Sequence, residues 1–262
     1  MTTNKSSIRV QAPTARPGAR SGATSGHLLA RLTPPRILAL ALAAAAVIAG
    51  ILIGVSVAGS SSTSSPKSLA GSAQTTALLS GIPQRGNVLG RPGAPVTLVE
   101  FADPACPFCR NFAVDTLPAI VQQYVRTGKV RLVYDGLAFV GPASENALRA
   151  VDAAGAQNRA WNVIDLLYRN QGDEHANWAT DSFLRVLAET VPGLDLVRML
   201  KDMGAAKTTA AMRASTGKAT AAGVHRTPTF FVGLTGGTLQ ELPVQSLDLS
   251  AFTPALDGLL AK

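Results

Sequence analysis

Two cysteines separated by two residues, Cys106 and Cys109, have the type and spacing in this chain most suited to chemistry. Thiols at this spacing can close a small disulfide ring and reopen it. They follow a predicted strand and precede a predicted helix, so Cys106 is expected at a helix start, where free N–H groups and the helix dipole favour negative charge. Thiol pKa values in such motifs are roughly 3.5–7.5, against about 8.5 for a free thiol. Pro107 suits the first helical turn, where its missing N–H costs nothing. This pattern predicts a redox-active dithiol.

Three other interpretations of the cysteine pair are a structural disulfide, two core thiols and half of a metal site. A disulfide across two residues closes too short a loop to stabilise the fold much. Two cysteines also cannot form a four-thiolate zinc site. Of the three histidines, His27 precedes the apolar segment described below, which leaves only His175 and His225 as imidazole ligands. We therefore expect neither a metal nor a cofactor.

The elements around the dithiol predict a strand–helix–strand unit. Residues 96–101 are β-branched and apolar enough for a buried strand, and apolar residues at 117–125 recur with helical spacing. Pro118 should kink this helix or begin a second segment. Residues 127–129, Thr-Gly-Lys, should end it, and residues 130–137 form the next strand. Such a unit suggests a right-handed parallel crossover.

Residues 142–222 differ, because their apolar residues recur at helical spacing and predict a helical block. Trp161 and Trp178 belong to this block, and packing is their expected role. Four elements are predicted after it: a strand at 229–232, a Gly-Gly turn at 236–237, a return strand near 238–242 and a closing helix at 256–260. The fold class is therefore α/β, in the order βαβ, helical insertion, ββα.

The basic charge of the chain lies in its N-terminal tail. Of 24 Lys and Arg residues, six lie in residues 1–36, which contain no acid, so the rest of the chain carries 18 basic and 16 acidic groups. This distribution argues against nucleic acid as a partner. Residues 37–58 contain no charge, and 22 residues of helix span roughly 33 Å, enough to cross a membrane.

The charge asymmetry around this segment places the N-terminus in the cytoplasm and the rest of the chain outside it. We expect 1–36 to be a disordered cytoplasmic tail, 37–58 a single transmembrane helix, 59–87 a flexible linker and 88–262 the folded domain. A signal peptide cleaved after Ala58 is the alternative, but the basic region and the apolar run are both longer than usual for one.

Two stretches of the sequence resemble the DsbA-like thiol:disulfide oxidoreductases of the thioredoxin superfamily. The first begins at Leu89-Gly90, continues through Ala94-Pro95-Val96-Thr97 and Glu100-Phe101-Ala102-Asp103, and ends at Cys106-Pro107-Phe108-Cys109. The second is Gly223-Val224-His225-Arg226-Thr227-Pro228-Thr229-Phe230-Phe231-Val232, which is similar to the family's cis-proline loop. The resemblance covers essentially residues 88–262 and implies a thioredoxin fold with a helical insertion at about 142–222.

The resemblance also implies how the site is arranged. It implies a solvent-exposed Cys106, a buried Cys109 and a cis peptide at Thr227–Pro228 facing the dithiol. The backbone of Thr227 would then be free to pair with an extended substrate. Pro107, Phe108, His225 and Arg226 would contribute to the same substrate-binding surface.

Glu100 is a further candidate catalytic residue. It lies late in a strand predicted to be buried, so it is either a solvated carboxylate at the strand end or a buried acid that exchanges a proton with Cys109. The resemblance favours the second interpretation, because many family members have an acid at the matching position.

The sequence departs from the family pattern in two places. Phe108 stands where strongly oxidising members typically have histidine, so one group that would stabilise the thiolate is absent. His225 and Arg226 stand where family members often have a glycine. Arg226 can supply positive potential near Cys106 or face solvent.

These observations predict a membrane-anchored, extracytoplasmic enzyme that introduces disulfides into exported cysteine-containing proteins. The resemblance implies reoxidation by a membrane partner, either a vitamin K epoxide reductase homologue or a protein of the DsbB type. A disulfide isomerase or a reductase of the same fold is the enzymatic alternative. An anchored thiol-based chaperone or copper-binding protein is the alternative of another class, since soft thiolates suit Cu(I).

Overall fold

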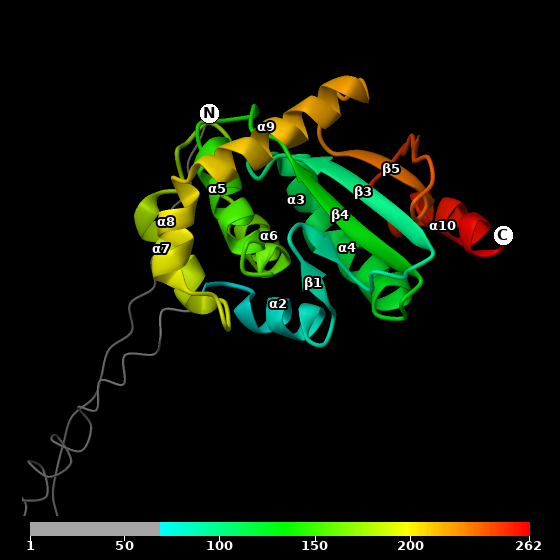
Figure 1. The fold of residues 1–262 in the computed structure, drawn as a ribbon, viewed down its shortest axis with the longest axis horizontal. Helices are drawn as coiled ribbons and strands as arrows, with labels where there is room; N and C mark the ends of the chain where they lie inside the picture. The colour runs from blue at the N-terminus through cyan, green and yellow to red at the C-terminus, as the bar shows by residue number, and fades with distance from the viewer. Residues whose placement is uncertain (1–68) are drawn as a thin grey trace, which may run out of the picture. The chain divides into compact units, whose positions relative to one another are not determined.

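A computed structural model describes residues 69–262, which are built around a sheet with strand order β1-β2-β4-β3-β5-β6 (Figure 1). Strands β3 (Val96–Ala102) and β4 (Val130–Gly136) run parallel, and β5 (Thr229–Leu234) pairs antiparallel with β3 on its other side. Every residue of β3 is buried, because β3 lies between two strands and both of its faces are covered. The predicted α/β thioredoxin fold is confirmed.

A continuous helical segment connects β3 to β4. It consists of α3 (Pro107–Asn111), the π-helical turn η1 (Phe112–Thr116), α4 (Leu117–Ile120) and a second π-helical turn, η2 (Val121–Val125). Pro118 lies in the first turn of α4, so a second helical segment does begin there, as predicted. The segment ends before Gly128, which has a φ of 78°.

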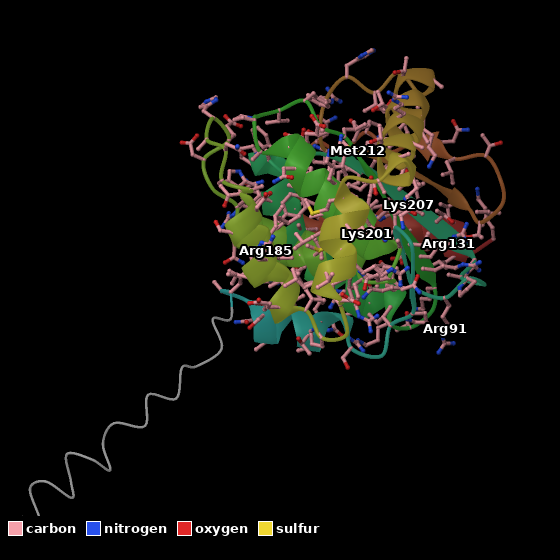
Figure 2. The ribbon with its side chains drawn as sticks, turned by 60° about the vertical axis from the view of Figure 1, so that its left-hand side comes forward. Arg91, Arg131, Arg185, Lys201, Lys207 and Met212 are labelled. Carbon is pink, nitrogen blue, oxygen red and sulfur yellow. The ribbon has the colours of Figure 1, made fainter. Side chains whose placement is uncertain are left out.

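The helical insertion is also confirmed. Its helices are α5 (Ser144–Gly155), α6 (Ala160–Arg169), α7 (Asp181–Thr190), α8 (Leu196–Met203) and α9 (Ala206–Ala221). Helix α9, orange in Figure 1, runs from α8 toward the loop before β5. Figure 2 shows basic side chains on one face of the molecule, among them Arg185, Lys201 and Lys207 of the insertion. Trp161 packs as expected, and its Nε1–H donates to the Asn87 carbonyl at 3.0 Å.

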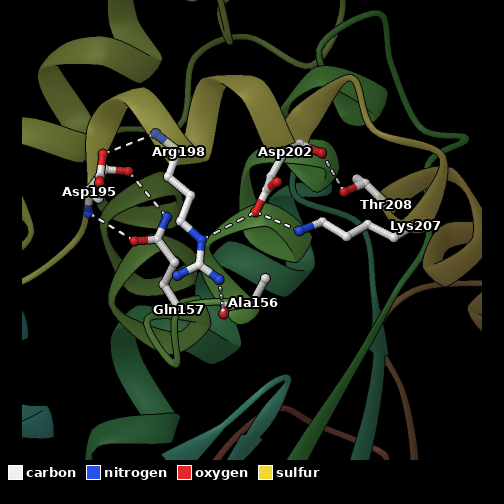
Figure 3. A network of polar contacts seen from close by, with 7 residues as sticks. All are labelled: Ala156, Gln157, Asp195, Arg198, Asp202, Lys207 and Thr208. Carbon is white, nitrogen blue, oxygen red and sulfur yellow. Dashed lines mark hydrogen bonds and ion pairs between the residues drawn. The ribbon is translucent and has the colours of Figure 1, made fainter.

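A polar network joins α8 to its neighbours in the insertion (Figure 3). Asp202 accepts an ion pair from Lys207 at 2.7 Å, and its carbonyl accepts the Thr208 hydroxyl at 2.6 Å, so both contacts join α8 to α9. Arg198 lies 3.6 Å from Asp202 and donates to the Ala156 carbonyl after α5 at 3.1 Å. These contacts fix the relative positions of α5, α8 and α9.

The remaining elements are the short strands toward the two edges of the sheet and the C-terminal helical elements. They are β1 (Gln84–Arg85), β2 (Val88–Leu89), β6 (Gln240–Glu241), the 3-10 turn η3 (Leu249–Ala251) and α10 (Thr253–Leu260), which packs against β5 and β3. Phe112, Phe230 and Phe252 form an aromatic cluster with ring centroids 4.7–5.2 Å apart. This cluster joins the helical segment after the dithiol to β5 and to the C-terminal helix.

The flexible linker predicted over 59–87 is wrong for its described part. Residues Ser72–Leu79 form α2, which packs on α6, and β1 and β2 add a hairpin beside β4. The physical reason is burial, because Leu78, Leu79 and Ile82 all enter the core. The predicted tail at 1–36, span at 37–58 and first part of the linker lie outside the described residues. Of the helices in residues 69–262, none has both the length and the apolar character that a membrane crossing requires.

Candidate active site

Cys106 is the N-cap residue of α3, as the sequence predicts for the reactive thiol. Its Sγ accepts the Cys109 N–H at 3.4 Å and, as a thiol, donates to the Thr227 carbonyl at 3.4 Å. Both cysteines are free thiols in this structure. The exposure implied by the family resemblance is wrong, because Cys106 is only 3% exposed and Cys109 is fully buried. The loop at Thr227 covers the Cys106 sulfur, whereas Phe108 is 64% exposed.

The two thiols differ in acidity. Hydrogen bonding lowers the Cys106 pKa from 9.0 to about 6. The largest contribution comes from the Cys109 side chain, and smaller ones come from the Thr227 side chain and the backbone of Cys109 and Phe108. Burial opposes the change. Burial is the largest influence on Cys109 and, with Cys106 and Glu100, raises its pKa well above 9.0. At neutral pH the pair therefore holds one thiolate, on Cys106, and one thiol, on Cys109.

Glu100 is a buried acid rather than a solvated carboxylate at a strand end. It is 5% exposed, and its Oε1 has no hydrogen-bond partner within residues 69–262. Burial, followed by the charge of Cys106, raises the Glu100 pKa from 4.5 to about 8. Glu100 is also among the groups that raise the Cys109 pKa. Glu100 is therefore protonated at neutral pH and can exchange its proton near that value.

The peptide bond between Thr227 and Pro228 is cis, as predicted. A groove of about 350 Å³ begins beside this peptide. Its walls come from the CxxC turn, the cis-proline loop and the chain after β6: Phe108, Arg226, Thr227, Pro228, Thr229, Phe230, Glu241, Leu242, Val244, Gln245, Ser246 and Leu247. The structure thus brings Phe108, Arg226, Thr227 and Pro228 together along one surface. His225 is exposed and does not line this groove.

Sequence reasoning missed two tyrosines near the thiols. Tyr134 lies opposite Glu100 in the β3–β4 register, and its hydroxyl lies 3.2 Å from that of Tyr168 on α6. Both side chains are buried, and the charge of Cys109 is among the influences that raise their pKa values. The contact between the two hydroxyl groups could not be predicted from the sequence, because the two tyrosines are 34 residues apart. Each lies among apolar residues of a strand or helix pattern, which predicts burial but not its partner.

Within residues 69–262, no three or more His, Cys, Asp or Glu side chains gather in a way that could hold a metal ion.

Known proteins with similar sequences point to one family. A family model described as Thioredoxin matches residues 84–240. A probable disulfide bond formation protein D of Bacillus cereus is 35% identical over 118 residues, which are 44% of this chain and 55% of that protein. A protein of the same description from Bacillus anthracis is 30% identical over 147 residues, 55% of this chain and 68% of the relative. The chain thus spans about half to two thirds of the length of these relatives.

A solved structure with a similar fold is the oxidised BdbD of Bacillus subtilis, with a TM-score of 0.60 and 22% identity. The match covers 69% of this chain and 98% of BdbD. The family model and the curated relatives, together with the fold, place the chain in the thioredoxin family, among its DsbA-like thiol:disulfide oxidoreductases.

Proposed function

We propose that this chain oxidises dithiols in exported proteins, from a membrane-anchored position outside the cytoplasm. The difference in acidity between its two thiols is the observation that carries the proposal. A thiol of low pKa is a good leaving group. Stabilisation of the Cys106 thiolate also favours the reduced form of the enzyme, so the Cys106–Cys109 disulfide is oxidising.

The reaction begins with the enzyme in its disulfide form. A substrate thiolate attacks the Cys106 sulfur, which forms a mixed disulfide and breaks the Cys106–Cys109 bond. Cys109 leaves as a thiolate and takes up a proton. A second substrate thiolate then attacks the substrate sulfur of the mixed disulfide, and Cys106 leaves as a thiolate. The substrate has lost two electrons to form its disulfide, and the enzyme has gained them as the Cys106 thiolate and the Cys109 thiol.

Glu100 supplies the proton that Cys109 takes up in this scheme. Its carboxyl group is neutral at neutral pH, lies in the same buried surroundings and affects the Cys109 pKa. In the reverse direction, when the enzyme is reoxidised, Glu100 accepts the Cys109 proton. Glu100 therefore assists the step at Cys109 without taking part in covalent attack at Cys106.

The groove beside Thr227 is where an extended substrate would bind. The Thr227 carbonyl lies 3.4 Å from Cys106 Sγ, so a strand paired with the Thr227 backbone would bring its cysteine to that sulfur. Phe108 and Arg226 would contact residues on either side of this cysteine. His225 does not line the groove, so the proposed binding surface does not include it.

Reoxidation requires a two-electron acceptor, which we assign to a membrane partner such as a vitamin K epoxide reductase homologue or a protein of the DsbB type. The uncharged segment at 37–58, with six basic groups before it, supports an anchor with the domain outside the cytoplasm.

The equilibrium reduction potential of Cys106–Cys109 against glutathione tests the direction of the reaction. An oxidase should have a potential more positive than about −180 mV, the value of protein disulfide isomerase. A potential near the −270 mV of thioredoxin would instead support a reductase. A serine variant of both cysteines gives the baseline for the measurement.

Location can be tested with a membrane-impermeant maleimide on intact cells after mild reduction. Cys106 and Cys109 are the only cysteines in the sequence, so any labelling of the chain reports the side on which the dithiol lies. Labelling only after the cells are permeabilised would contradict the proposed topology.

A further inference from the structure

The short loop between β3 and α3 determines where the Cys106 sulfur lies. Its backbone turns at Asp103, whose carbonyl accepts the Cys106 N–H at 3.0 Å. The thiolate is stabilised by hydrogen bonding with the Cys109 side chain first, then with the Thr227 side chain and the N–H groups of Cys109 and Phe108. Hydrogen bonds depend steeply on direction. Small movements of the loop would therefore change the acidity of Cys106.

The Asp103 carboxylate holds this loop from inside the protein. Asp103 is fully buried, and its Oδ1 accepts the Ala105 N–H at 2.8 Å and the Ser144 hydroxyl at 2.6 Å. Its Oδ2 accepts the N–H groups of Phe139 and Val140 at 2.7 and 2.9 Å. One side chain thus ties the reactive loop to the chain after β4 and to the start of α5.

Gln171 holds the same loop from the end of α6. Its side-chain amide donates to the carbonyl oxygens of Pro104 at 2.8 Å and Cys106 at 3.1 Å, which lie on either side of Ala105. Tyr168 adds a third contact, because its hydroxyl donates to the Asp103 carbonyl at 3.2 Å. Three of the four carbonyl groups of the turn, those of Asp103, Pro104 and Cys106, therefore accept hydrogen bonds from side chains of the insertion.

We propose that Asp103 and Gln171 are positioning residues, through which the helical insertion sets the acidity of Cys106. Neither side chain contacts the Cys106 sulfur. They fix the peptide groups before it, so that the sulfur lies in line with the N–H groups of Cys109 and Phe108. The inference rests on the proposed function only in that the thiolate of Cys106 is the reacting group.

The experiment measures the Cys106 pKa by ultraviolet thiolate absorbance in the reduced full-length chain. Asp103→Asn keeps the shape of the side chain but has one acceptor oxygen in place of two. It therefore cannot accept from Ala105 and Ser144 on one side and also from Phe139 and Val140 on the other. Gln171→Met keeps the length and removes both donors. Each change should raise the Cys106 pKa by about one unit toward the ordinary value of about 8.5, a roughly tenfold change in the ionisation constant. The rate of alkylation at mildly acidic pH should fall by a similar factor.

Matched controls separate positioning from a general loss of stability. Asp135→Asn is the control for Asp103→Asn, because it changes another buried aspartate, with Lys218 and Ser215 of α9 among its partners. Gln84→Met is the control for Gln171→Met, because it removes the hydrogen bonds of another glutamine to Asn162 and Trp161. Both should lower the thermal midpoint and leave the Cys106 pKa unchanged. A folded Asp103→Asn or Gln171→Met protein with an unchanged Cys106 pKa would overturn the inference.

Two further arms keep the result decisive. If Asp103→Asn does not fold, Ser144→Ala removes one of the four donors to the carboxylate and should raise the Cys106 pKa by a smaller amount. The measurement needs no substrate or redox partner. A pKa change in these variants together with a reducing potential in the unmodified chain would therefore reject the proposed oxidase and retain the positioning role.

Discussion

Replacement of Glu100 by glutamine should make the stability of the reduced protein less dependent on pH. The Glu100 pKa is raised from 4.5 to about 8 in the fold, chiefly by burial. Below the lower of these values the group is protonated in both the folded and the unfolded state, so it does not affect the free energy of unfolding. As the pH rises, the unfolded chain ionises first and the folded state loses stability until the pH passes about 8.

The size of this loss follows from the two pKa values. Each pKa unit of difference between the folded and unfolded states corresponds to about 1.36 kcal/mol. The free energy of unfolding should therefore fall by about 5 kcal/mol in total once the pH exceeds the folded-state pKa, and by about 3 kcal/mol at pH ~7. Glu100→Gln cannot ionise and should lack this contribution. A glutamine amide in this buried place has its own cost, but that cost does not vary with pH.

The assay is denaturant unfolding of both reduced proteins at a series of pH values between about 4 and 9. The difference between the two free energies of unfolding should move in favour of Glu100→Gln by a few kcal/mol as the pH rises. Asp135→Asn serves as the control for loss of a buried carboxylate outside the site. Parallel curves for Glu100→Gln and the unmodified protein would refute the assignment of a raised pKa to Glu100, and with it the proton exchange.

Three further predictions concern the thiols and α2. A limiting amount of iodoacetamide at mildly acidic pH should label Cys106 before Cys109, because only Cys106 has a lowered pKa; peptide mass spectrometry showing the opposite order would reverse their roles. Phe108→His should lower the Cys106 pKa further with little change in stability, since position 108 is 64% exposed, and an unchanged thiolate titration would contradict this. Thr75→Val should lower the free energy of unfolding by about 1–3 kcal/mol in urea, because it removes a hydroxyl that bonds buried Asp165; no change would show that this contact does not stabilise the fold.

The dithiol and the order of the main elements could be predicted because each has a local pattern in the sequence, whereas the cis geometry of Thr227–Pro228 follows only from the family resemblance. Cys106 and Cys109 lie between a run of β-branched residues and a helical pattern. Thr227-Pro228 directly precedes a second apolar run. In such places local propensity and the final structure agree, so short segments are informative.

The parts that could not be predicted depend on contacts between distant segments. The burial of Cys106 depends on Thr227, which is 121 residues away, and the bond between Thr75 and Asp165 spans 90 residues. Asp103 looks like an ordinary turn residue in the sequence. Its four donors become apparent only when the chain after β4 folds back against the active-site loop.

The position of α2 also determines where a recombinant fragment of this protein can begin. The family match starts at residue 84, but a fragment cut there would lose Leu78, Leu79 and Ile82 from the core. It would also lack Thr75, whose hydroxyl donates to the buried carboxylate of Asp165. Asp165 would then keep its ion pair with Arg169 but lose this hydrogen bond. Asp165 lies on α6, one turn before Tyr168, and Gln171 directly follows this helix, so such a cut would weaken the helix that supports the reactive loop. A fragment intended to preserve the chemistry of the site should therefore start before Ser72.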